Sequence, residues 1–127
     1  NPAGVRIGTS EIYRPVEEMS EIMDSLVVAQ PWESDVRIVL FVVLRDGLQL
    51  DAELVAKIKA AVRRDNTPRH VPSLILAIPE VPRTISGKKV EKAALQTIKN
   101  EIVENTAALA NPESLDYFSK LSEELSH

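Results

Sequence analysis

The alternation of apolar and polar residues predicts a short strand and then a helix at the start of the chain. Residues 5–7 read as a strand that ends at Gly8. Thr9 or Ser10 can cap a helix, because a hydroxyl oxygen accepts a hydrogen bond from a free N–H of the first turn. Apolar residues then recur at helical spacing at Ile12, Val16, Met19, and Ile22 or Met23. We therefore expect one amphipathic helix over this stretch.

Two apolar runs rich in β-branched residues come next. Residues 26–29 and 36–44 read as strands, and residues 31–35, which include Pro31, read as the turn that joins them. Branched side chains pack well on a pleated surface, so these runs are predicted to form the centre of a sheet.

A second helix is predicted after Asp51, which is a good N-cap residue. Leu50 and Val55 flank the cap at the spacing of a hydrophobic staple. The apolar stripe continues at Leu54, Ile58, Ala61 and Val62. We expect this helix to end near Arg64 or Asp65.

The last third of the chain predicts a strand, a helix and a tail. Residues 74–78 form an apolar run between two prolines, and a helix is expected from about Lys89. Its inward positions are Val90, Ala94, Ile98 and Ile102. The tail after residue 105 keeps the aromatic pair Tyr117-Phe118 and is expected to pack back on the domain. This order predicts an α+β fold: a small mixed sheet of about three strands plus a short N-terminal strand, covered by helices.

Composition narrows the class of protein. With 127 residues and 44% hydrophobic content, the chain is long enough for one core. Lys and Arg number 15 against 19 Asp and Glu, a net charge of -4, so a nucleic-acid partner is not expected. The absence of cysteine excludes a disulfide framework, a thiol nucleophile and a cysteine-built zinc site. No apolar run approaches the length of a membrane span, and a cytoplasmic protein without a membrane partner is the default.

The chemistry that this sequence offers is concentrated in residues 82–88, Pro-Arg-Thr-Ile-Ser-Gly-Lys. A turn of small residues presents the Lys88 ammonium where we expect a helix to begin. Lys88 and Lys89 in a first helical turn would oppose the macrodipole, at ~0.3–1 kcal/mol each, unless an anionic ligand offsets this. The run also resembles the C-terminal signature of the adenylate-forming enzymes, the superfamily of acyl-CoA synthetases, luciferases and peptide-synthetase adenylation domains.

Other stretches carry the same resemblance, in the same order. Residues 4–12 resemble the segment that follows the interdomain hinge in that superfamily, and residues 69–72 resemble the turn before its last strand. The double lysine before Val90 and Glu91, together with residues 111–118, resembles the acetoacetyl-CoA synthetases. This resemblance implies a C-terminal lid domain over residues 1–105 and, over residues 106–127, a C-terminal extension that packs on it.

The resemblance also implies a two-step reaction with ATP and CoA as cosubstrates and Mg²⁺ held mainly outside this domain. Lys88 would be the catalytic cation of the first step, in which acetoacetate becomes an acyl-adenylate. Arg6 would contact a phosphate of ATP or AMP, and Arg63 a phosphate of CoA. Gly4 and Gly8 would line the pantetheine channel after the lid rotates, because glycine lets the backbone approach closely.

Position 1 is Asn rather than Met, so we expect this chain to be a fragment. The resemblance implies an N-terminal adenylation domain upstream in the same chain that supplies the remaining pockets. A lysine acyltransferase or deacylase is a further expected partner, because acylation would neutralise Lys88.

Each assignment has a plainer alternative. Without the resemblance, Lys88 would be interpreted as a solvated lysine, and Gly4 and Gly8 as turn residues on either side of a short strand. Arg63 is favourable at a helix end through the dipole alone. For the whole chain the alternatives are another short-chain acyl-CoA synthetase, using acetate, propionate or 3-hydroxybutyrate, and a stand-alone α/β module that binds an anion at the Lys88 turn.

Overall fold

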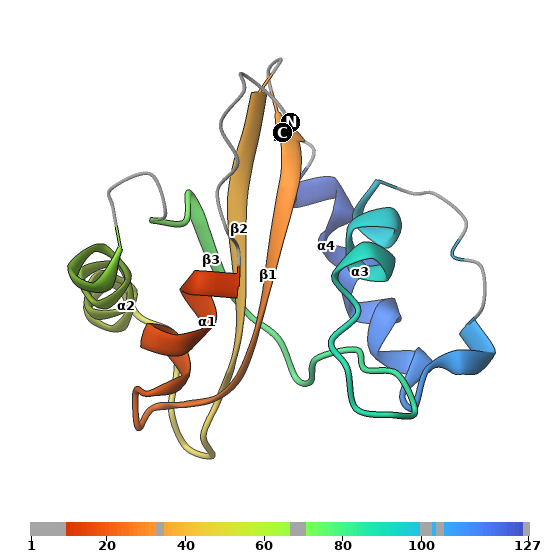
Figure 1. Cartoon of the computed structure of the whole chain (residues 1–127), viewed down its shortest axis with the longest axis horizontal. Coiled ribbons are helices and arrows are strands. Elements are labelled where there is room, and N and C mark those ends of the chain that lie inside the picture. The colour runs from red at the N-terminus through yellow and green to blue at the C-terminus, as the bar shows by residue number, and fades with distance from the viewer. Residues whose placement is uncertain (1–9, 33–34, 67–70, 100–102, 104–105, 126–127) are drawn as a thin grey trace. The chain divides into compact units, whose positions relative to one another are not determined.

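Figure 1 shows the computed structural model of the chain, which describes residues 10–32, 35–66, 71–99, 103 and 106–125. The contacts divide the chain into two compact units, Asn1–Ile78 and Pro79–His127. The short strand expected at residues 5–7 lies outside the described residues.

The first unit is built on a three-stranded sheet in the order β1-β2-β3. β1 (Ile22–Trp32) and β2 (Asp35–Leu44) are antiparallel, with Leu26 opposite Phe41. β3 (Leu74–Ala77) runs parallel to β2, with Ile75 opposite Leu40. The predicted mixed sheet is therefore confirmed.

β1 is longer than the sequence suggested at both ends. It includes Pro31 and Trp32, which we expected in the turn, so that expectation was wrong. Proline lacks an N–H and is tolerated on an edge strand, and β1 is an edge strand of this sheet.

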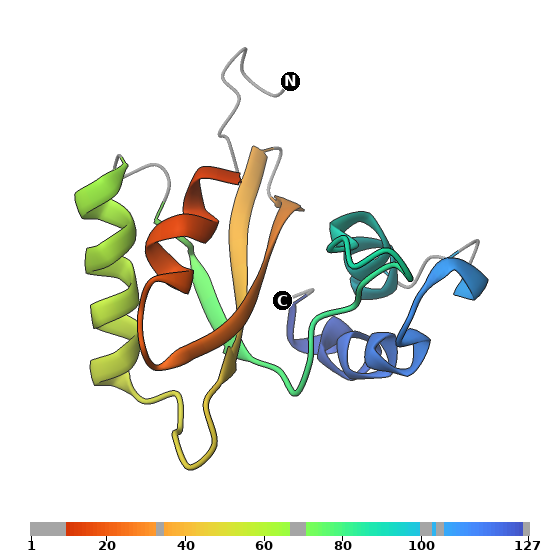
Figure 2. The same ribbon diagram turned by 60° about the horizontal axis from the view of Figure 1, so that its bottom comes forward.

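Two helices, α1 (Ser10–Glu17) and α2 (Ala52–Asp65), cover one face of the sheet. Figure 2 shows both helices on the same side of the strands. The predicted cap of α2 is confirmed, because the Leu54 N–H donates to Asp51 Oδ1 at 2.8 Å. The core between helices and sheet consists of Ile12, Val16, Ile22, Val27, Ile38, Leu40, Val42, Leu54, Ile58, Val62 and Ile75.

The first helix is shorter than predicted. α1 ends at Glu17, and a turn closed by the Ile22 N–H and the Met19 carbonyl leads into β1. Ile22 and Met23 therefore belong to the strand, and the Met23 side chain is 61% exposed. Ile22 pairs with Leu44 of β2, and Met23 lies at the register shift before Asp24, so sheet formation outweighs the helical spacing of these positions.

Polar contacts hold α1 and its turn in place. The Val27 N–H donates to the Tyr13 hydroxyl at 2.8 Å, and Ser25 Oγ donates to Glu17 Oε2 at 2.6 Å. Lys57 of α2 donates to the Glu21 carboxylate, and this hydrogen bond lowers the pKa of Glu21.

The second unit contains α3 (Glu91–Ile98), the 3-10 helices η3 (Thr106–Ala108) and η4 (Pro112–Ser114), and α4 (Leu115–Leu125). α3 contacts α4, and Phe118 of α4 is fully buried. Within the described part of the chain, no helix has the length and apolar character needed to cross a membrane. The division into a lid and an extension at residues 105 and 106 stays a prediction.

Candidate functional site: the Lys88 turn

Lys88 lies at the end of a tight turn, residues 84–88, that closes on Thr84. The Thr84 N–H donates to the Lys88 carbonyl at 2.8 Å, and the Gly87 N–H donates to the Thr84 carbonyl at 2.8 Å. The Lys88 N–H donates to Thr84 Oγ1 at 3.0 Å. Gly87 has a φ of 92°, a conformation that glycine adopts without the penalty of a side chain. The backbone that carries the ammonium is thus fixed at both of its polar groups.

The arms of the turn pair with each other. Arg83 and Lys89 form an antiparallel bridge, and the Val90 N–H donates to the Pro82 carbonyl at 3.1 Å. Arg83 Nη1 also donates to the Gly87 carbonyl at 2.9 Å. These bonds make residues 82–90 a small hairpin that holds the turn rigid.

This hairpin corrects the expectation that Lys88 and Lys89 start a helix. α3 begins at Glu91, so both lysines lie before it: Lys88 ends the turn, and Lys89 pairs with Arg83. The reason is that the groups a first helical turn would use are committed to the hairpin. Neither lysine therefore lies in the first turn of α3, where a cation opposes the macrodipole, and Glu91 in that turn suits the dipole.

The tip of the turn is open to solvent. Ile85 is 74% exposed, and Ser86, Gly87 and Lys88 are also exposed. Among the residues that the structure describes, no carboxylate forms an ion pair with the Lys88 ammonium. A positioned cation without a pairing carboxylate can interact with an anionic ligand.

A later segment, residues 108–111, lies alongside the first arm of the turn. The Ile85 N–H donates to the Ala108 carbonyl at 3.0 Å, and the Ala110 N–H donates to the Arg83 carbonyl at 2.9 Å. Thr84 and Leu109 form an antiparallel bridge between these bonds. We name residues 108–111 the strap. This pairing was not predicted from the sequence, because the local pattern of residues 108–111 gives no sign of a strand.

Arg63 lies exposed in the last turn of α2, in the first unit. Its neighbour Arg64 donates to Asp65 Oδ1 at 3.0 Å, and this hydrogen bond raises the pKa of Arg64. The two arginines therefore differ, since Arg64 is committed to a carboxylate. Gly4, Arg6 and Gly8 lie outside the described residues.

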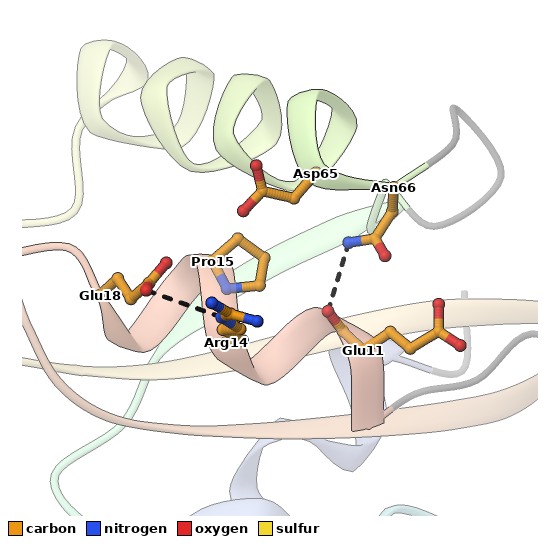
Figure 3. A pocket seen from close by; sticks show the side chains of 6 residues that line it. All are labelled: Glu11, Arg14, Pro15, Glu18, Asp65 and Asn66. Carbon is orange, nitrogen blue, oxygen red and sulfur yellow. Dashed lines mark hydrogen bonds and ion pairs between the residues drawn. The ribbon is translucent and has the colours of Figure 1, made fainter.

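The groove between α1 and α2 contains two open cavities of about 530 and 560 Å³. Figure 3 shows the first, where Asn66 Nδ2 donates to the Glu11 carbonyl at 3.2 Å and Arg14 lies 3.7 Å from Glu18. Its lining residues are Glu11, Arg14, Pro15, Glu18, Asp65 and Asn66. Across the described ranges, no group of three acidic or histidine side chains could hold a metal ion.

Comparison with known proteins defines the class. The family model of the AMP-binding enzyme C-terminal domain matches residues 16–88, which is more than half of the chain and ends on Lys88. The chain therefore belongs to the family of AMP-binding enzyme C-terminal domains, and the resemblance to the adenylate-forming enzymes is confirmed.

Two curated relatives within that class carry the same name. The chain is 50% identical over 123 residues to the acetoacetyl-coenzyme A synthetase of Rhizobium meliloti (strain 1021), covering 97% of this chain and 19% of the relative. It is 46% identical over 124 residues to the acetoacetyl-CoA synthetase of Rattus norvegicus, covering 97% of this chain and 18% of that protein.

A solved structure agrees with these relatives. The acetoacetyl-CoA synthetase from Streptomyces lividans superposes with a TM-score of 0.86 at 30% identity, over 96% of this chain and 19% of that structure. The chain thus spans about a fifth of the length of the proteins it matches.

Proposed function

We propose that this chain is the C-terminal domain of an AMP-forming acid-thiol ligase that activates acetoacetate and transfers it to CoA. The observation that carries the proposal is the Lys88 turn: an exposed ammonium on a rigid hairpin, at the end of the segment that matches the family. The name shared by the two relatives and the solved structure reported above supports acetoacetate over acetate, propionate or 3-hydroxybutyrate.

In the first half-reaction, a carboxylate oxygen of the acid bonds to the α-phosphorus of ATP, and the bond to pyrophosphate breaks. Negative charge spreads over the oxygens around the phosphorus in the transition state. Lys88 stabilises that charge from a fixed position, and removal of such a preorganised donor typically costs ~10²–10³ in rate.

In the second half-reaction, the CoA thiol displaces AMP from the acyl-adenylate. We propose that the domain rotates between the steps, withdraws Lys88 and presents another face to the same centre. Gly4 and Gly8 then line the pantetheine channel, Arg63 contacts a phosphate of CoA, and Arg6 contacts a nucleotide phosphate. An N-terminal adenylation domain supplies the acyl and adenine pockets and most of the Mg²⁺ site.

The test is Lys88→Ala in a full-length chain that carries both domains. ATP–pyrophosphate exchange should fall at least ~10²-fold, because only the first step uses the charge. Thioester formation from chemically supplied acyl-adenylate should stay near the unsubstituted rate. Lys92→Ala is the matched control, because Lys92 is an exposed lysine four positions further on. Equal loss in both half-reactions would contradict the assignment of Lys88.

We further propose that a cytoplasmic lysine acyltransferase and deacylase regulate the enzyme through Lys88. The exposed side chain is accessible, and acylation removes both its charge and its hydrogen-bonding capacity. Mass spectrometry that finds Lys88 acylated in fully active enzyme would rule this out.

A further inference from the structure

The hairpin that carries Lys88 does not stand alone, because the strap pairs with its first arm. The strap supplies acceptors and donors to the backbone of Arg83 and Ile85 on both sides of Thr84. Thr84 in turn holds the N–H and the carbonyl of Lys88. A continuous set of hydrogen bonds therefore runs from the strap, through Thr84, to the residue that bears the ammonium.

Asn111 is the one strap residue that contributes a side chain to these bonds. Its Oδ1 accepts from the Arg83 N–H at 2.9 Å, and its Nδ2 donates to the Val81 carbonyl at 2.9 Å. The amide thus grips the chain on both sides of Pro82, where proline offers no N–H. Although Asn111 precedes η4, its side chain makes no cap bond to that helix.

The backbone of Asn111 is itself held. Ser114 is 4% exposed, and its Oγ donates to the Asn111 carbonyl at 2.7 Å, while its N–H donates to the same oxygen at 3.0 Å. Ser114 therefore fixes the main chain of Asn111, and this in turn fixes the position of the Asn111 side-chain amide.

We propose that Asn111 is a positioning residue for Lys88, which it orients through the backbone of Arg83 and Thr84. This inference rests on the proposed catalytic role of Lys88. Loss of the amide leaves the Arg83 N–H and the Val81 carbonyl without their partner and frees the first arm of the turn. A displacement of about 1 Å in a reacting group can reduce a rate by about 10²-fold.

The experiment compares Asn111→Ala and Asn111→Asp in the full-length chain. Asn111→Ala should lower ATP–pyrophosphate exchange by about tenfold to 10²-fold and spare thioester formation from supplied acyl-adenylate. Asn111→Asp keeps the acceptor for the Arg83 N–H but places a second oxygen against the Val81 carbonyl. Its exchange rate should therefore lie between those of Asn111→Ala and the unsubstituted chain. Glu113→Ala, an exposed change two residues away, should leave both rates unchanged.

Two outcomes would overturn the inference. One is an equal loss in both half-reactions for the two Asn111 variants, which indicates a general folding role. If Asn111 acts only through Lys88, the double variant Lys88→Ala, Asn111→Ala exchanges no more slowly than Lys88→Ala alone. The second contradicting outcome is therefore a double variant that exchanges more slowly than Lys88→Ala, with the two losses additive.

The same measurements separate this inference from the proposed function. If Lys88→Ala itself leaves exchange intact, the role of Lys88 is wrong. If Lys88→Ala abolishes exchange while both Asn111 variants retain it, only the positioning role is wrong.

Discussion

At the scale of single residues, the Lys88 turn depends on the backbone conformation of Gly87. Its φ of 92° lies where residues with a side chain are strained, although a Cβ atom there would meet nothing within 4 Å. Gly47, in the first unit, has a φ of 84° and equally open surroundings. The two glycines are therefore matched in strain and differ in which segment they shape.

This match gives a controlled prediction. Gly87→Ala and Gly47→Ala should each lower the free energy of unfolding by about 1–2 kcal/mol, the cost of a left-handed conformation for an L-residue. Only Gly87→Ala should also reduce ATP–pyrophosphate exchange, because it alone reshapes the turn under Lys88. Denaturant titration and exchange assays on both variants provide the measurement. Similar exchange rates in the two variants would show that the turn tolerates distortion.

The Lys88 signature and the Asp51 cap could both be recognised in the sequence, because both depend on short-range patterns; the cap is confirmed and the role of Lys88 stays a prediction. Seven consecutive residues carry the lysine signature, and the bond that confirms the cap joins Asp51 to a residue three positions on. Asn111 was not predicted as a site residue, because its side-chain partners lie 28 and 30 positions earlier. Local spacing contains no information about a pairing over that distance.

At the scale of elements, α2 combines a predicted structure with a proposed ligand contact. Its start, its apolar stripe and its end agree with the prediction, because the helix has both a cap and an uninterrupted period. The boundary between α1 and β1 was misplaced, because Ile22 and Met23 fit the helical period. Ile22 pairs with Leu44 of β2, and Met23 lies at the register shift that follows within β1. The last turn of α2 contains both Arg63 and Arg64, and Arg64 is hydrogen-bonded to Asp65.

Arg63→Ala should weaken CoA binding. A charge-assisted phosphate contact is worth roughly 1.5–3 kcal/mol, so the KM for CoA should rise about tenfold or more while the KM for ATP changes little. Arg64→Ala is the matched control, because that arginine is hydrogen-bonded to Asp65, and its KM for CoA should stay near the unsubstituted value. Steady-state thioester assays at varied CoA give both constants. An equal rise in the two variants would indicate a general effect of positive charge at this helix end.

At the scale of the whole molecule, the order of elements was enough to predict an α+β fold with a mixed sheet, since few topologies fit so few strands. The division of contacts at Ile78 and Pro79 was not predicted, because compactness depends on which elements touch and not on their order. The relatives are about five times longer than this chain, because the matched segment is about a fifth of their length. This share of the length is consistent with our proposal that the acyl and adenine pockets lie in another domain.

Alternation between two faces of the domain makes the strictest prediction, because a substitution far from Lys88 must give the opposite phenotype. Gly4→Leu should spare ATP–pyrophosphate exchange and stop thioester formation, since a leucine side chain fills space that pantetheine needs only after rotation. Gly4→Ala, with a much smaller side chain, should slow the second step less. Both half-reactions would be measured in the full-length chain beside Lys88→Ala.

Two results would contradict the alternation. One is normal thioester formation in Gly4→Leu. The other is a loss of exchange as severe as in Lys88→Ala, which would mean that both residues serve the same step. In either case the two faces do not take turns at one centre, and Lys88 acts without the proposed rotation.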